Sequence, residues 1–204
     1  MSVIIKEFLK KPVQNNNYVV VDETTKEAIL IDCSWPDDEI MDWVKQEGFN
    51  LKYILLTHGH FDHVLGVNYY KDKFDIDAYL YEKDEALLAD AVRYARHFNL
   101  SDAAPVRVQT FNTKTKFKVG KYEIKVILTP GHTQGGVCYL IDGNLFSGDT
   151  LFHGTYGRTD LAESDEAKMQ ESLQKLFEEL PDETPVYPGH GAATTISHER
   201  WLYK

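Results

Sequence analysis

The sequence predicts a layered α/β fold in which two similar halves pack their sheets together and keep their helices outside. β-rich runs precede alternating strand and helix patterns in residues 1–98, and the same order returns in residues 116–190. The chain has 204 residues and 43% hydrophobic content, which is enough for one core, and no Pro-, Ser- or Gly-rich linker interrupts it. We therefore predict a single domain over residues 1–204.

The first half is expected to begin as a β meander and to continue as alternating helices and strands. Residues 36–48 combine a proline start, an acidic first turn, apolar residues at helical spacing and a glycine stop, which together predict a helix. Short runs of β-branched and aromatic residues predict strands. The predicted strands are Val3–Ile5, Tyr18–Val21, Ala28–Ile31, Tyr53–Leu56 and Ala78–Tyr81, and the predicted helices are Pro36–Gly48, Asp62–Tyr70 and Lys83–Phe98.

The second half returns to β patterns before a single long helix. Glycine-containing turns at Gly120-Lys121 and at Asp142-Gly143-Asn144 separate neighbouring strands. The predicted strands are Phe117–Val119, Tyr122–Leu128, Val137–Ile141, Leu145–Phe146 and a short one near Val186, and the predicted helix is Glu166–Leu180.

Composition narrows the classes of partner. The 22 Lys and Arg residues against 32 Asp and Glu residues give a net charge of −10, which disfavours binding to nucleic acid and to anionic membranes. No apolar run approaches the roughly 18 residues that span a bilayer, and residues 1–11 lack the apolar centre of a signal peptide, so a cytoplasmic location is expected. Cys33 and Cys138 are predicted to be buried, reduced thiols.

Four potential metal ligands lie within six residues, directly after the predicted strand Tyr53–Leu56. If the chain stays extended there, His58 and His60 point to the same side and can share one cation. Once a helix begins near Asp62, the side chains of Asp62 and His63 diverge around its axis and reach a second point. Imidazoles and carboxylates held this close indicate bound cations.

Three further candidates each follow a predicted strand: His132, Asp149 and His190. Loops at strand ends commonly carry active-site groups, and the glycines and prolines beside the two histidines favour tight turns. Seven ligands are enough for two cations that share a bridging carboxylate and leave one coordination position open.

This ligand set resembles that of the metallo-β-lactamase superfamily, whose H-x-H-x-D-H signature stands at residues 58–63 and is followed by the later His, Asp and His in the expected order. The resemblance covers nearly the whole chain and implies an αββα sandwich of two mixed β-sheets flanked by helices, with the metals at one edge. It also implies that His58, His60 and His132 bind one metal, that Asp62, His63 and His190 bind the other, and that Asp149 bridges them.

Within the superfamily the chain looks most like the glyoxalase II branch, the hydroxyacylglutathione hydrolases. The residues that carry this likeness are Gly148–Phe152 and Pro188–Gly191, with Thr194 and Thr195 after them. The chain resembles a short form of that branch, since it ends fourteen residues after His190 without the C-terminal helical extension. The resemblance implies that Arg158 contacts the thiol-bearing part of the substrate, and Tyr156 in the same loop is a second candidate for substrate binding.

The chemistry expected of such a centre is hydrolysis. Two divalent cations lower the pKa of a shared water to roughly 7, so that hydroxide is the nucleophile while Asp62 or Asp149 orients it. The resemblance implies a small thioester such as S-lactoylglutathione as the substrate, and its thiol, with a pKa near 8.5, can leave without a dedicated general acid. No phosphate-binding loop and no serine or cysteine nucleophile motif competes with this interpretation.

Several alternatives remain open from the sequence. The metals are expected to be zinc, with iron or manganese also compatible with His and Asp ligands. The stretch 157–160 also resembles iron-dependent persulfide dioxygenases, which would hold one iron with His58, His132 and Asp149. A lactone, β-lactam or phosphodiester substrate and a non-catalytic binding role complete the set. His97 and His198 are expected on the surface, the role of His153 is left open between surface and pocket, and no oligomeric state is predicted.

Overall fold

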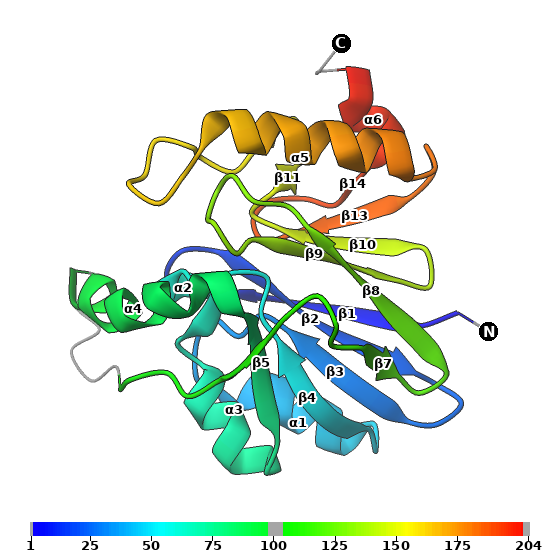
Figure 1. The fold of residues 1–204 in the computed structure, drawn as a ribbon. Coiled ribbons are helices and arrows are strands. Elements are labelled where there is room, and N and C mark those ends of the chain that lie inside the picture. Colours follow the sequence, from blue (N-terminus) through cyan, green and yellow to red (C-terminus); the bar gives the residue numbers. More distant parts are fainter. Residues whose placement is uncertain (1, 98–103, 202–204) are drawn as a thin grey trace.

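The computed structural model describes residues 2–97 and 104–201, and it confirms the predicted fold class of two mixed sheets flanked by helices (Figure 1). Each main sheet contains six strands in the part of the chain that the structure describes. The two sheets come from the two halves of the sequence, as the repeated order of β and α/β patterns predicts.

The first sheet has the strand order β1-β2-β3-β4-β5-β6. The first three strands form an antiparallel meander, and the strands from β3 to β6 run parallel to one another. Helices α1 and α3 pack against its outer face through one apolar cluster, and α2 and α4 lie together at one end (Figure 1). The bounds are β1 Ile4–Lys10, β2 Asn15–Asp22, β3 Glu27–Ile31, α1 Asp38–Gln46, β4 Asn50–Leu55, α2 Phe61–Val64, α3 Val67–Phe74, β5 Asp77–Tyr81, the 3-10 turn η1 Glu82–Asp84, α4 Glu85–His97 and β6 Gln109–Phe111.

The second sheet has the strand order β14-β13-β10-β9-β8-β7, in which only the β10 and β13 pair is parallel. Helix α5 covers its outer face through a separate apolar cluster (Figure 1). A small hairpin of β11 and β12 leaves the sheet beside the strand ends. The bounds are β7 Phe117–Val119, β8 Tyr122–Leu128, β9 Val137–Ile141, β10 Asn144–Gly148, β11 Leu151–Phe152, β12 Thr155–Tyr156, α5 Glu166–Glu179, β13 Pro185–Pro188, β14 Thr194–Thr195 and α6 Ile196–Arg200.

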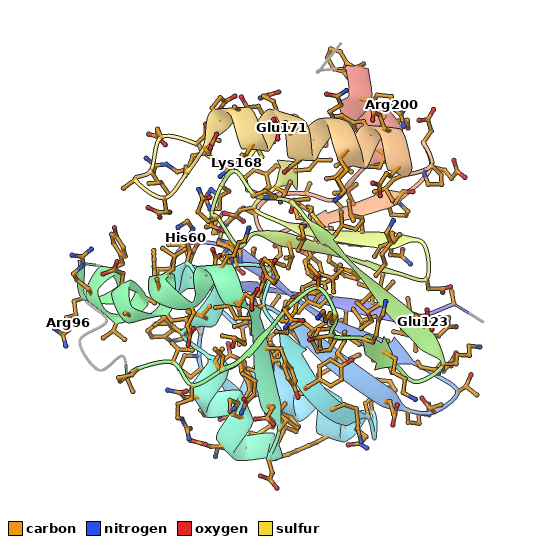
Figure 2. All side chains as sticks on the ribbon, in the orientation of Figure 1. His60, Arg96, Glu123, Lys168, Glu171 and Arg200 are labelled. Atoms are coloured by element: carbon orange, nitrogen blue, oxygen red, sulfur yellow. The ribbon has the colours of Figure 1, made fainter. Side chains whose placement is uncertain are left out.

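The core between the sheets is built mainly from aromatic and β-branched side chains, and Figure 2 shows side chains filling this space. Strand β2 is buried along all eight residues, because it contributes to two clusters at once. Val19 and Val21 face the helices of the first half, whereas Tyr18 and Val20 face the second sheet. This alternation follows from the period of two along a strand, and it explains why the strand reads as a continuous apolar run.

One predicted helix is wrong in its continuity. Residues 62–70 form two helices, α2 and α3, which are separated at Leu65 and Gly66. The loop after β3 presses against this point: the amide of Gly66 donates to the carbonyl of Cys33 at 2.8 Å, and a Cβ on Gly66 would lie 2.9 Å from that oxygen. The break is a tertiary contact, which helical periodicity does not reveal.

The other differences concern ends and short elements. Helix α1 begins at Asp38 rather than at the predicted Pro36, because the Asp37 side chain caps it by accepting from the Glu39 amide. The predicted helix from Lys83 starts as the turn η1, and its predicted last residue, Phe98, lies outside the described residues. The elements that the sequence did not predict are β6, β11, β12, β14 and α6, which are each two to five residues long and carry too few positions to show a period.

The two cysteines are free and buried, as predicted. No helix within residues 2–97 or 104–201 has both the length and the apolar character needed to span a bilayer.

Removing one ring from the core between the sheets should destabilise the whole fold. Phe146 is fully buried and stacks on Tyr187 with ring centroids 5.3 Å apart. We expect Phe146→Ala to lower the free energy of unfolding by about 3–5 kcal/mol in urea titrations at fixed metal concentration. The matched control, Leu9→Ala at a residue 56% exposed, should change it by less than about 0.5 kcal/mol. Equal effects of the two substitutions would contradict this packing.

Candidate metal centre

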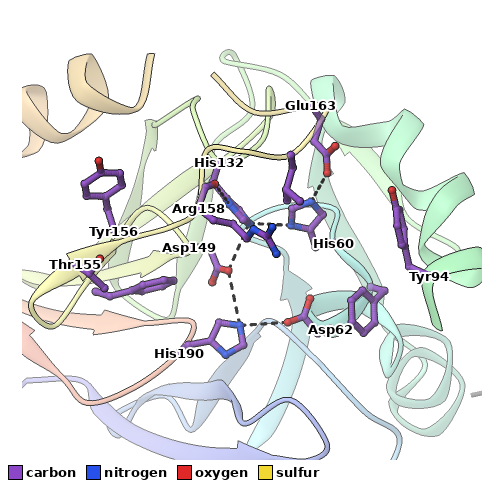
Figure 3. A pocket seen from close by; sticks show the side chains of 13 residues that line it. His60, Asp62, Tyr94, His132, Asp149, Thr155, Tyr156, Arg158, Glu163 and His190 are labelled. Atoms are coloured by element: carbon purple, nitrogen blue, oxygen red, sulfur yellow. Dashed lines mark hydrogen bonds and ion pairs between the residues drawn. The ribbon is translucent and has the colours of Figure 1, made fainter. Parts of the chain in front are cut away.

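The seven predicted ligands meet at one edge of the paired sheets. Strands β3 and β4 of the first sheet and β10 and β13 of the second run parallel within each pair, so their carboxyl ends lie at the same edge. His58 and His60 follow β4, Asp149 follows β10, and His190 follows β13. The structure thus brings together all the residues that the strand-end pattern selected, and Figure 3 shows His60, His132, Asp149 and His190 among them.

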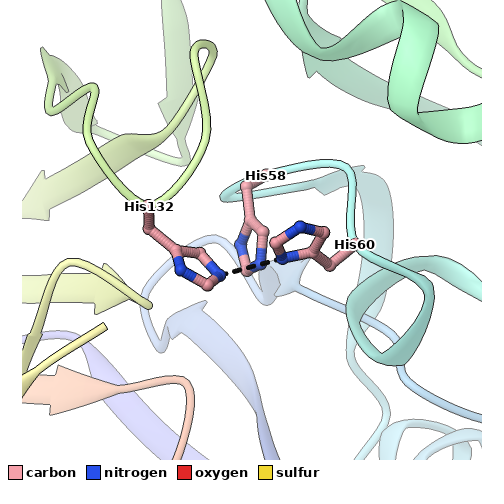
Figure 4. A group of neighbouring side chains, drawn as sticks. All are labelled: His58, His60 and His132. Atoms are coloured by element: carbon pink, nitrogen blue, oxygen red, sulfur yellow. Dashed lines mark hydrogen bonds between the residues drawn. The ribbon is translucent and has the colours of Figure 1, made fainter. Parts of the chain in front are cut away.

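Three imidazoles form the first group, and Figure 4 shows them converging from two loops. His60 Nδ1 lies 2.8 Å from His132 Nε2, and the ring of His58 lies 4.8 Å from that of His60. The remaining nitrogen of His132, Nδ1, lies 2.8 Å from the carbonyl oxygen of Arg158, to which it can donate. That contact holds the His132 ring with its other nitrogen toward the group.

Asp62, His63 and His190 form the second group, and Asp149 lies between the two. His190 Nε2 is 3.2 Å from Asp62 Oδ2 and 3.7 Å from Asp149 Oδ2. The same Asp149 oxygen lies 3.5 Å from His132 Nε2 of the first group. The position of Asp149 is therefore the one that a carboxylate shared by two cations requires.

Two buried atoms of this centre have no hydrogen-bond partner among the described residues: His58 Nε2 and Asp149 Oδ1. Such orphaned atoms are costly in a folded protein, and a cation bound to them would remove the cost. Imidazole nitrogens and carboxylate oxygens are also the donors that zinc and iron accept. The residues present therefore fit a metal centre.

Burial and charge set the protonation of the cluster. Burial lowers the pKa of His58 well below its ordinary value, which leaves the imidazole neutral, as a metal ligand must be. Burial alone would raise the pKa of Asp149, but the surrounding imidazoles, His63 first, hold it well below its ordinary value. Asp149 is thus an anion at neutral pH.

Carboxylates outside the seven orient two of the histidines. Asp32 follows β3, and its Oδ2 lies 2.8 Å from His63 Nδ1 and also accepts from the Thr57 hydroxyl at 2.8 Å. Glu163 Oε1 lies 2.7 Å from His60 Nε2. Partners of this kind fix the orientation and tautomer of a ligating imidazole. The strand-end rule could have found Asp32, since β3 ends at the same edge as β4.

Asp84 ties together the two loops that carry the first group. Its side chain is fully buried and accepts from the amides of Gly59 and Gly135, at 3.0 and 2.5 Å, and from the Thr133 hydroxyl at 2.7 Å. Gly59 lies between His58 and His60, and Thr133 follows His132. Sequence analysis missed this residue because it lies at the start of a helix with no chemical motif around it.

The absence of a side chain at Gly189 also shapes the centre. A Cβ on Gly189 would lie 2.3 Å from Asp149 Oδ1 and 2.8 Å from His63 Cε1. The residue before His190 must therefore be glycine for Asp149 and His63 to keep their places, in line with the tight turns expected from the sequence.

The centre opens into a cavity of about 570 Å³ (Figure 3). Its predicted substrate-binding residues, Tyr156 and Arg158, do line the cavity, but the Arg158 guanidinium pairs with Asp160 through bonds of 2.7 and 2.9 Å. Five ligand candidates form part of the wall. The full lining is His60, Phe61, Asp62, Tyr94, His132, Asp149, Phe152, Thr155, Tyr156, Arg158, Leu161, Glu163 and His190.

The apolar wall of this cavity escaped prediction. Phe61 and Tyr94 come from the first half, and Phe152 and Leu161 come from the second. A single aromatic or leucine residue carries no signal that separates a pocket wall from a core, so only the fold brings these four together. His153, whose role the sequence left open, does not line the cavity; its ring stacks against His198.

A cluster of His and Asp ligands at the edge of an αββα sandwich defines the class of this protein. The profile of the metallo-β-lactamase superfamily matches residues 11–190, and the chain belongs to that family.

The chain is similar to several named proteins of known sequence or structure. It is 35% identical over 176 residues to the probable polyketide biosynthesis zinc-dependent hydrolase BaeB of Bacillus velezensis, covering 86% of this chain and 72% of that protein. It is 31% identical to the hydroxyacylglutathione hydrolase GloC of Haemophilus influenzae, covering 92% and 90%. The crystal structure of TTHA1623 in a di-iron-bound form superposes with a TM-score of 0.84 at 33% identity, covering 96% of each chain.

Loss of the Glu163 carboxylate should weaken metal binding without removing a ligand. We expect Glu163→Ala to raise the Kd for metal by about 10- to 100-fold, because His60 loses the acceptor that orients it. Glu163→Gln, which keeps an acceptor oxygen, should have a smaller effect. The measurement is competition with a chromophoric chelator, and the control is Glu171→Gln on the exposed face of α5. Unchanged affinity in the alanine variant would refute the role of Glu163.

Substituting Asp84 should cost stability at the loops of the first group. Asp84→Asn presents one acceptor oxygen in place of two, so it leaves a buried amide or hydroxyl unsatisfied at a cost of about 1–3 kcal/mol. Urea unfolding of the apoprotein measures this directly. The control, Asp72→Asn at a side chain 67% exposed, should be nearly neutral. Equal stability of the two variants would argue against the bonds made by Asp84.

Proposed function

We propose that this protein is a binuclear metal-dependent hydrolase that cleaves a small thioester. The observation that carries the proposal is the placement of the His and Asp centre on the floor of one cavity with an apolar and aromatic wall. A cavity of about 570 Å³ suits a small molecule rather than a polymer.

The seven residues divide into two sites. His58, His60 and His132 would hold one cation, Asp62, His63 and His190 would hold the other, and Asp149 would be shared. Two divalent cations bound there supply an acidified water and a Lewis acid for the substrate carbonyl. Zinc is the first choice, supported by the zinc-dependent relative BaeB, and the di-iron form of TTHA1623 keeps iron as an alternative.

The side chains of the centre position the attacking water. Asp62 is part of the cavity wall and is partly exposed to it, so its carboxylate can accept a hydrogen bond from the water and orient it. The apolar side chains Phe61, Phe152 and Leu161 exclude bulk water from the acyl group. Tyr156 lies at the same wall, with its hydroxyl held by Glu166 at 3.0 Å.

The carboxylates of the cavity favour a leaving group that departs as an anion. Asp62 pairs with His190 at 3.2 Å, Asp149 with His132 at 3.5 Å, and Glu163 with His60 at 2.7 Å. None of these three carboxylates is therefore placed as a separate acid that protonates an amine or alkoxide. A thiolate needs no such acid, since its conjugate thiol has a pKa near 8.5.

The similarity to GloC supports a thioester of glutathione as the substrate. Because the Arg158 guanidinium is paired with Asp160, it is only partly available to a substrate carboxylate. Other acyl thiols, such as an acylated N-acetylcysteamine, therefore belong in the same test.

The decisive experiment compares a thioester with its oxygen-ester analogue. We expect the metal-loaded protein to release free thiol from S-lactoylglutathione or an acyl-N-acetylcysteamine, and to cleave the oxygen ester at least about tenfold more slowly because alkoxide leaves less readily. Chelation should abolish turnover and divalent metal should restore it. Asp149→Ala should lower kcat/KM by more than about 100-fold, whereas the surface control Asp42→Ala should match the parent chain.

Two other outcomes would overturn the thioester assignment. Cleavage of a lactone, β-lactam or phosphodiester without any thiol release would leave a metal hydrolase with a different substrate. Oxygen consumption with a glutathione persulfide would instead favour a mononuclear iron dioxygenase built on His58, His132 and Asp149. The bound iron of the similar protein TTHA1623 supports testing iron at this centre, although its two irons favour a binuclear arrangement.

A further inference from the structure

A second cluster of metal-binding side chains lies outside the centre described above. His153, His198 and Glu199 each offer one ligand atom, and these three atoms lie within 4.8 Å of one another. His153 is the turn residue between β11 and β12, and the other two belong to α6. None of the three lines the 570 Å³ cavity.

The two imidazoles are arranged as a pair. Their rings stack with centroids 4.9 Å apart and planes inclined by 16°. Both side chains are exposed, so the imidazoles can rotate, and no hydrogen bond of the His153 ring occurs among the described residues. In this stacked arrangement the lone pairs lie in nearly parallel planes, so one of the exposed imidazoles has to rotate before both can bind one ion.

The carboxylate of Glu199 is the third member of the cluster. It is fully buried, and its oxygens accept from the Gly154 amide at 2.9 Å and from the Thr194 hydroxyl at 2.6 Å. Within the part of the chain that the structure describes, its one ion-pair partner is His198 Nε2, at 3.9 Å from Oε1. A buried carboxylate that no Lys or Arg neutralises carries a large desolvation cost, which a cation beside it offsets.

We propose that His153, His198 and Glu199 bind an additional divalent transition-metal ion. Two imidazoles and one carboxylate form a donor set that suits zinc, copper or nickel and disfavours calcium or magnesium. Zinc bonds of about 2.1 Å place tetrahedral ligand atoms about 3.4 Å apart, so the exposed imidazoles need to close by roughly an ångström. Water fills the remaining positions.

A metal ion at this position would link the β11–β12 hairpin, which forms part of the cavity wall, to helix α6. The hairpin that carries His153 also carries Phe152, Thr155 and Tyr156, which line the cavity. Its tip is held to α6 by the hydrogen bond from the Gly154 amide to the Glu199 carboxylate, and a metal would add a second link through one bond to the hairpin and two to α6. The hairpin becomes more rigid when the metal binds.

Equilibrium dialysis with elemental analysis tests this site. Holoprotein, loaded at its central site and freed of excess metal, is dialysed against increasing Zn²⁺. We expect the parent chain to take up one more equivalent than either His153→Ala or His198→Ala, with the affinity for that equivalent at least tenfold weaker in both variants. The matched control is His97→Ala, which removes a histidine of α4 and should keep the extra equivalent.

Amide hydrogen exchange provides a readout independent of stoichiometry. Added Zn²⁺ should slow exchange in residues 151–156 of the parent chain and leave the His198→Ala variant unchanged. All four proteins should have the same basal activity. The proposal fails if no extra equivalent binds to the parent chain, if either substitution leaves the affinity for that equivalent unchanged, or if the hairpin exchanges equally fast with and without metal.

Discussion

Crowding of buried imidazoles and carboxylates at one edge of the sandwich is the constraint on which the rest of this structure depends. His58, His63 and Asp149 share a space from which water is largely excluded, and His58 Nε2 and Asp149 Oδ1 make no hydrogen bond to the described residues, although the latter lies 3.3 Å from His63 Nε2. The fold tolerates this arrangement because two sheets hold it from opposite sides. Strands β4 and β10 deliver their ends to the same place only if the sheets pack at the register seen here.

The supporting contacts come from elements that carry no ligand themselves. Asp32 at the end of β3, Asp84 before α4 and Glu163 before α5 each bond to a ligating residue or to the loop beside it. All three are carboxylates, so they add negative charge around a centre that binds cations. This negative charge favours retention of metal cations, and the three carboxylates contribute to the net negative charge of the chain.

Sequence reasoning recovered the sheets, the long helices and the seven converging ligands, because each has a local signal. The ligands follow apolar strands, and His58 to His63 form one dense motif. The break at Gly66, the hairpin after Asp149 and the contacts of Asp84 had no such signal, since each depends on a segment distant in the chain. Tyr156 and Arg158 both line the cavity, and the ion pair with Asp160 limits how the Arg158 guanidinium can act.

The candidate metal ligands and the residues of the cavity wall lie on different kinds of element, and this separation has an evolutionary consequence. Most of the candidate ligands follow buried strands of the two sheets, whereas the wall residues Tyr94 and Phe152 stand on an exposed helical face and a two-residue strand. Replacing a wall residue therefore disturbs few core contacts. Substitutions in the wall can therefore change which substrate the cavity accepts while the metal centre stays the same.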